Sequence, residues 1–82
     1  MTFIGRTGQF CDVVVNDLAA SMKHAAIRRD ADGFWISDLG SRVGTFVNGE
    51  VLNGTPRRLR NWDRIELGRV RSHWLFMESQ AS

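Results

Sequence analysis

Residues 38–49 read Asp-Leu-Gly-Ser-Arg-Val-Gly-Thr-Phe-Val-Asn-Gly, and the interpretation of the whole chain begins from this stretch. Residues 34–39 form a largely apolar run typical of a strand entering a core, and residues 45–47 resume that pattern after two glycines. Asn48-Gly49 strongly indicates a two-residue hairpin, because type I′ turns need positive φ at both central residues. A glycine-shaped loop between two buried strands can present fixed donors to a ligand. We therefore expect the functional site in this loop and its neighbours.

Short β-branched or alternating segments lie on both sides of this stretch. We expect strands at residues 2–4, 11–15, 24–29, 34–39, 45–47, 50–52, 57–60, 64–67 and 70–77. Residues 18–23 are too few to bury a helix face and are expected to form a loop. Many short strands separated by Gly and Asn turns predict an all-β fold, an antiparallel sandwich or barrel.

The size and charge of the chain restrict its function. Its 82 residues suffice for one domain, which we expect to cover residues 1–78, with residues 79–82 as a flexible tail. The net charge of +2 is too small to argue for nucleic acid. Ten of the eleven basic residues are arginine, which suits bidentate recognition of phosphate or carboxylate.

Cysteine usage and hydropathy predict a cytoplasmic protein without membrane contact. Cys11 is the single cysteine, so an internal disulfide is impossible, and no apolar run approaches the length of a membrane span. One cysteine with His24 and His73 does not make a metal ligand set. We expect neither a metal nor another cofactor.

Three pieces of sequence stand in a fixed order: Gly5-Arg6, then Ser21-x-x-His24, then the stretch of residues 38–49. Together with Leu59, Asp63-x-Ile65 and Gly68, they resemble the forkhead-associated (FHA) domain, which recognises phosphothreonine. The resemblance spans roughly residues 4–76. It implies a two-sheet antiparallel β-sandwich that is short at its N-terminus, with peptide-binding loops at one end.

The resemblance also implies roles for single residues. A phosphate carries about −1.5 to −2 charges at neutral pH and favours short, charge-assisted donors. The phosphate-binding residues would be Arg6 and Ser21, with Lys23 as a further cation. The loops that contact the peptide would contain Thr7, Met22, Ser41, Arg42 and Val43. The loop supports would be Gly5, His24, Gly44 and Thr45. Asp38 is expected to stabilise its loop, since a carboxylate beside the phosphate would repel it.

The chain departs from the family pattern at four places. Val43 stands where the family carries an asparagine whose amide grips the peptide backbone, and valine offers no such group. Met22 replaces a polar residue that contacts phosphate, and Trp62 replaces a glycine. The family also has two strands before the Gly-Arg loop, whereas this sequence begins almost at that loop. The phosphate anchors are therefore kept while the backbone clamp is lost.

Three alternatives remain beside a phosphothreonine-binding module. A degenerate domain could mediate interaction or self-association without phosphorylation. Ser21, His24 and Asp38 have the side chains of a hydrolase triad, but no nucleophile elbow accompanies them, so we do not expect an enzyme. The arginines between residues 57 and 71 could contact nucleic acid, but scattered charges are usually a solvated face.

We also expect self-association through the last strand. Residues 70–77 would form an open sheet edge that includes Trp74 and Phe76, and such an edge pairs readily with a second copy to give a homodimer. One alternative is that Arg69, Arg71 and His73 keep this edge monomeric, and another is that a further segment of a longer parent protein pairs with it.

Overall fold

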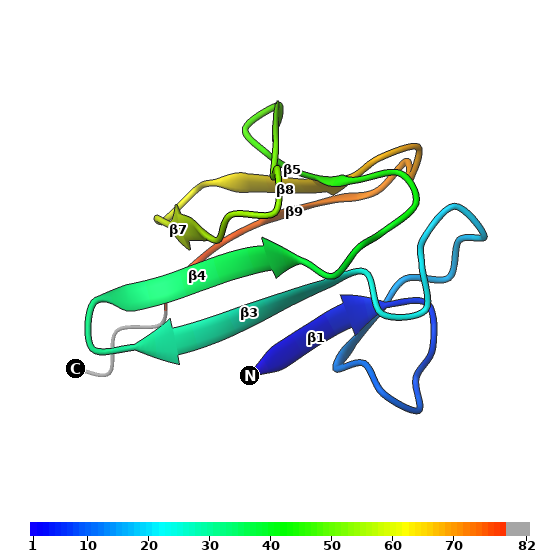
Figure 1. The fold of residues 1–82 in the computed structure, drawn as a ribbon, viewed down its shortest axis with the longest axis horizontal. Coiled ribbons are helices and arrows are strands. Elements are labelled where there is room, and N and C mark those ends of the chain that lie inside the picture. The colour runs from blue at the N-terminus through cyan, green and yellow to red at the C-terminus, as the bar shows by residue number, and fades with distance from the viewer. Residues whose placement is uncertain (79–82) are drawn as a thin grey trace.

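The computed structural model describes residues 1–78 and folds them into two stacked sheets (Figure 1). The first sheet has the order β2-β1-β3-β4-β7, and the second has the order β6-β5-β8-β9. The strands are β1 (Thr2–Gly5), β2 (Val13–Val14), β3 (Ala25–Asp30), β4 (Gly33–Asp38), β5 (Thr45–Val47), β6 (Glu50–Val51), β7 (Arg57–Leu59), β8 (Arg64–Leu67) and β9 (His73–Leu75). The predicted two-sheet sandwich is confirmed. Within residues 1–78, no helix has the length and hydropathy needed to cross a bilayer.

The core lies between the inward faces of the two sheets. Ile36 of β4, Val47 of β5 and Leu67 of β8 are almost completely buried there. The strand β8 shows the pattern most clearly, because Ile65 and Leu67 are buried while Arg64 is exposed. This alternation has the period of two that a strand with one buried face requires.

The Asn48-Gly49 turn has the geometry that the sequence predicts. Asn48 has φ 52° and Gly49 has φ 83°, both in the left-handed region. The Asn48 side chain also joins this turn to the next hairpin, since its Oδ1 accepts from the Arg64 N–H at 2.9 Å and its Nδ2 donates to Asp63 at 2.9 Å. The hairpin β5–β6 is therefore held on β8 by side-chain bonds as well as by the strand ladder.

The strand predicted at residues 11–15 is too long, and the strand found there departs from the antiparallel pattern of the rest of the fold. Only Val13–Val14 is a strand, and it pairs with β1 in parallel, the one parallel pair among the described strands. Cys11 instead lies in a turn, where its N–H donates to the Thr7 carbonyl at 3.0 Å. The Asp12 carboxylate accepts from the Phe3 N–H at 2.9 Å, a bond that no local pattern would reveal.

The predicted last strand at residues 70–77 is too long, because β9 covers only His73–Leu75. Val70 belongs to the preceding turn, where its N–H donates to the Leu67 carbonyl. Beyond β9 the Phe76 N–H still bonds to Asp63, and the Phe76 carbonyl still accepts from Trp62. The hydrogen-bonded hairpin therefore continues past the end of the strand.

Other strand ends differ by one or two residues. The strand β4 stops at Asp38, because the Asp38 carboxylate accepts from the Ser41 N–H and turns the chain, which leaves Leu39 exposed. The strand β3 begins after His24, β6 lacks Leu52 and β7 lacks Arg60. The tail expected at residues 79–82 lies outside the described residues.

Candidate functional site

Three loops meet at one end of the sandwich, at the right of Figure 1. We call them the Arg6 loop (residues 6–12), the Ser21 loop (residues 15–24) and the Val43 loop (residues 39–44). The Arg6 N–H donates to the Ser21 carbonyl at 3.0 Å, and the Arg42 N–H donates to the Ser21 hydroxyl at 3.1 Å. Ser21 is therefore in direct contact with both neighbouring loops.

The Ser21 hydroxyl is held with its hydrogen still available. Its oxygen accepts from the Arg42 N–H, so the hydroxyl can donate its own hydrogen to a ligand. The exposed guanidinium groups of Arg6 and Arg42 form no ion pair with any residue of 1–78. The three loops thus bring a fixed hydroxyl donor and uncommitted cations to the same end of the fold.

His24 connects the Ser21 loop to the Val43 loop from inside the fold, where it is 0% exposed. Its Nδ1 accepts from the Ser21 N–H at 3.1 Å, so the ring proton lies on Nε2 and is donated to the Gly44 carbonyl at 2.9 Å. Both ring nitrogens are occupied by backbone groups, which leaves neither of them for a ligand. Neither nitrogen bonds the Ser21 hydroxyl either, so the contact that a hydrolase triad needs is not made.

The Val43 loop is organised by Asp38 and Ser41. The Asp38 carboxylate accepts from the Ser41 hydroxyl, from the Ser41 N–H at 3.0 Å and from the Thr45 hydroxyl at 2.7 Å. The Ser41 hydroxyl in turn accepts from the Gly44 N–H at 2.9 Å. Partial burial acts to raise the pKa of Asp38, but the hydrogen bonds from Ser41 and Thr45 outweigh it, and the pKa lies below its ordinary value. The Ser41 side chain is thus committed to the loop itself.

Gly5 and Cys11 allow the Arg6 and Ser21 loops to approach each other. A Cβ on Gly5 would overlap the Met22 carbonyl oxygen and approach the Cys11 sulfur, so no larger residue fits there. The Cys11 thiol donates to that same carbonyl, with a sulfur–oxygen distance of 3.1 Å. Sequence reasoning assigned Gly5 a supporting role but did not identify Cys11, because no local pattern shows that this thiol reaches a loop eleven residues away.

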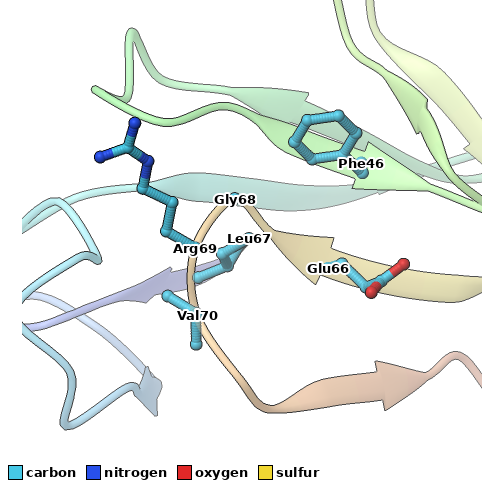
Figure 2. Close-up of a pocket in the computed structure, with 6 residues that line it drawn as sticks. All are labelled: Phe46, Glu66, Leu67, Gly68, Arg69 and Val70. Atoms are coloured by element: carbon cyan, nitrogen blue, oxygen red, sulfur yellow. The ribbon is translucent and has the colours of Figure 1, made fainter.

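Gly68 supports the Val43 loop from the second sheet. Its N–H donates to the Gly44 carbonyl at 2.9 Å, and a Cβ on Gly68 would overlap the Val43 carbonyl oxygen. Beside it lies a cavity of about 290 Å³, lined by Phe46, Glu66, Leu67, Gly68, Arg69 and Val70 (Figure 2). Neither Arg6 nor Ser21 lines this cavity, so it is separate from the proposed anchors.

The remaining predicted residues lie on the same three loops. Met22 and Lys23 are exposed on the Ser21 loop, and the Lys23 ammonium lies 4.7 Å from the centre of the Phe10 ring. Thr7 shapes the Arg6 loop, because its hydroxyl accepts from the Gln9 N–H. Within residues 1–78, no cluster of three or more His, Cys, Asp or Glu side chains could hold a metal ion.

Comparison with known proteins agrees with this geometry. A family model described as FHA domain matches residues 2–68. An oxoglutarate dehydrogenase inhibitor from Corynebacterium jeikeium (strain K411) is 38% identical over 60 residues, which cover 73% of this chain and 40% of that protein. The chain spans less than half the length of the curated relatives it matches.

Two solved structures are similar over most of the chain. The FHA domain of an Arabidopsis thaliana hypothetical protein superposes with a TM-score of 0.86 and 32% identity, covering 99% of this chain and 70% of the other. The MEK1 FHA domain in complex with a HOP1 phosphothreonine peptide superposes with a TM-score of 0.68 and 27% identity, covering 80% of this chain and 71% of the other.

Proposed function

The chain belongs to the FHA domain family, whose members bind phosphothreonine peptides, and on this premise we propose that its own ligand is a phosphothreonine-containing segment of a partner protein. It would act as an interaction module in signalling or assembly rather than as an enzyme. The relatives that match it include an oxoglutarate dehydrogenase inhibitor and a glycogen accumulation regulator. The identity of its own partner is not implied by theirs.

The proposal rests on one observation: the backbones of Arg6 and Ser21 are hydrogen-bonded to each other, and their side chains remain available to bind a ligand. The Arg6 N–H bonds to the Ser21 carbonyl at 3.0 Å, which fixes the spacing of the two backbones from which the guanidinium and the hydroxyl extend. A phosphate that reaches both would gain charge-assisted hydrogen bonds, each contributing about 1.5–3 kcal/mol. Phosphate recognition by arginine is a recurring mode of peptide binding.

The peptide backbone is held less well than the phosphate. We propose that the peptide crosses Thr7, Met22, Arg42 and Val43, of which Met22 and Val43 have no polar side-chain group to offer. Most of the free energy of peptide binding would therefore come from the contacts with the phosphate. We expect a dissociation constant in the micromolar range or weaker, equivalent to about −8 kcal/mol at 1 μM.

A phosphothreonine peptide library tests the proposal and does not require the partner to be identified. The domain should retain phosphorylated members and release the same sequences after phosphatase treatment. Equal retention before and after treatment would contradict phosphate recognition and favour an interaction module that does not depend on phosphorylation. The library also reports which side chains near the phosphothreonine are preferred.

A cytoplasmic location fits this function, and we include it in the proposal. Cys11 is a buried free thiol, as expected in a reducing compartment, and it donates to the Met22 carbonyl beside the site. We assign no role in nucleic-acid binding or membrane contact, because the partner chemistry that the loops favour is a phosphorylated peptide.

We also propose that the domain forms a homodimer through β9. This strand is the edge of its sheet, and within residues 1–78 no strand pairs with its outer side. Phe76 directs both backbone groups toward the β8 side, to Trp62 and Asp63. Because neighbouring residues point in alternate directions, the backbone groups of Leu75 face outward. Trp74 and Phe76, which the sequence placed at this edge, instead pack against the core. The exposed side chains nearby are those of Leu75 and Trp62, and a second copy would cover them.

A further inference from the structure

The side chains of Phe10 and Lys23 form a contact that is not needed to hold the loop backbones in place. Phe10 is 52% exposed on the Arg6 loop, and the Lys23 ammonium lies 4.7 Å from the centre of its ring. A cation this close to an aromatic face is attracted by the electron density of the ring. Because Phe10 is exposed on a polar loop, hydrophobic burial does little to stabilise its position. The Lys23 ammonium is therefore the interaction partner of this side chain that stands out.

This contact lies where the Arg6 loop and the Ser21 loop meet. Two other contacts join the same loops, from the Arg6 N–H to the Ser21 carbonyl and from the Cys11 thiol to the Met22 carbonyl. Those two contacts already fix the loop backbones. The Phe10–Lys23 contact adds a positive charge held beside the loops that carry Arg6 and Ser21.

We propose that Phe10 is a positioning residue that holds the Lys23 ammonium as the third phosphate-binding group of the site. The inference rests on the proposed phosphothreonine function. Lysine has a long flexible stem, and binding a ligand through it loses the freedom of that stem. The Phe10 ring restricts the ammonium before the ligand arrives. The ring takes one side of the ammonium, and the N–H donors directed away from it stay free for phosphate oxygens.

The same arrangement explains how the chain can bind phosphate with a methionine at position 22. Met22 contributes a carbonyl to the Cys11 thiol but has no side-chain donor. Lys23 is the next residue, and its side chain turns back to the ring on the Arg6 loop. The charge that Met22 lacks is thereby supplied one residue later, provided that an aromatic ring occupies position 10.

Calorimetric titration with a matched pair of phosphorylated and unphosphorylated peptides tests this inference. Phe10→Leu keeps an apolar side chain but removes the ring face, and should weaken binding of the phosphopeptide about two- to fivefold. Phe10→Trp keeps an aromatic face and should retain the affinity. Lys23→Ala should weaken binding at least as much as Phe10→Leu, and the double variant should bind like Lys23→Ala alone.

Arg29→Ala is the matched control. Its guanidinium also stacks on a phenylalanine, 5.5 Å from the Phe34 ring, but on β3 at the end of the strand away from the loops. The Arg29→Ala substitution removes one positive charge and should leave phosphopeptide binding unchanged. Wild-type affinity in Phe10→Leu, or losses that add in the double variant, would overturn the positioning role. If the wild-type chain binds both peptides equally, the proposed function itself fails.

Discussion

His24 and Asp38 are the polar side chains that hold the loops of the candidate site. His24 accepts from the Ser21 N–H, and Asp38 accepts from the Ser41 N–H and from two hydroxyl groups. In residues 1–78, every buried side-chain nitrogen and oxygen has a hydrogen-bond partner. A fully satisfied network of this kind makes a loop rigid, because any movement exposes an unpaired group to an apolar surrounding. The ligand would therefore meet loops that are already formed.

Replacing Asp38 by Asn should lower the free energy of unfolding by about 1–3 kcal/mol at neutral pH, because hydrogen bonds to a charged acceptor are lost. The folded-state pKa of Asp38 is lowered, so its stabilisation is complete above the unfolded-state pKa and is lost as pH falls through the folded-state pKa. The difference between wild type and variant in urea denaturation should therefore shrink in acid. A difference that stays constant to the lowest pH would contradict this role.

Restoring the peptide clamp should strengthen binding. Val43→Asn adds an amide where the backbone is already fixed by Gly68, and should tighten phosphopeptide binding by about 0.5–1.5 kcal/mol, the net contribution of one hydrogen bond. Calorimetry measures the gain, and Val43→Ala controls for the lost methyl groups. No gain in a folded Val43→Asn domain would mean that this loop does not meet the peptide backbone.

At the scale of elements, the turns carry more strain than the strands. Trp62 has φ 74° and is 66% exposed, an unusual backbone conformation for a bulky residue. Its N–H nevertheless bonds to the Phe76 carbonyl at 2.8 Å, which holds the end of the β8–β9 hairpin together. This strained residue lies at an exposed edge of the domain, where its indole ring is available to contact a partner protein.

Trp62→Gly should therefore raise the stability of the monomer. A non-glycine residue in the left-handed region costs about 1–2 kcal/mol, and the greater freedom of glycine in the unfolded chain offsets part of that gain. We expect a net increase of roughly 0.5–1 kcal/mol in urea denaturation at low protein concentration. Arg69→Gly, at φ 64° in another turn, is the matched comparison. A loss of stability in Trp62→Gly alone would show that the indole packs usefully within one chain.

Strand centres could be predicted from the sequence, whereas strand ends could not. The centres follow from apolar alternation, as in Arg64-Ile65-Glu66-Leu67, which is a local property. The ends depend on bonds to distant residues, such as the Asp12 carboxylate on the Phe3 N–H. In the site, the spacing of Arg6, Ser21 and His24 was informative only through family resemblance. The contact of Gly68 with the Val43 carbonyl continues the pairing of β8 with β5 beyond the strand ends, and because it joins segments far apart in the sequence it has no local signal.

At the scale of the whole molecule, the two sheets place the ligand loops at one end and leave β9 as an edge along one side. The proposed dimer would cover that edge without occupying the loops. Sedimentation velocity across a concentration series should show a monomer that converts to a dimer. Leu75→Lys, which places a charge on the outward face of β9, should keep the domain monomeric and leave phosphopeptide binding unchanged. A wild-type monomer at the highest concentration would contradict the dimer.

The central claim is that Arg6 and Ser21 recognise a phosphate, and one titration tests it most directly. A phosphothreonine peptide and its unphosphorylated twin are titrated into wild type, Arg6→Ala and the charge-matched control Arg29→Ala. We predict that wild type and Arg29→Ala bind the phosphopeptide alone, and that Arg6→Ala loses most of this binding, since one charge-assisted bond contributes about 1.5–3 kcal/mol. Equal binding of the two peptides by wild type, or unchanged binding by Arg6→Ala, would contradict it.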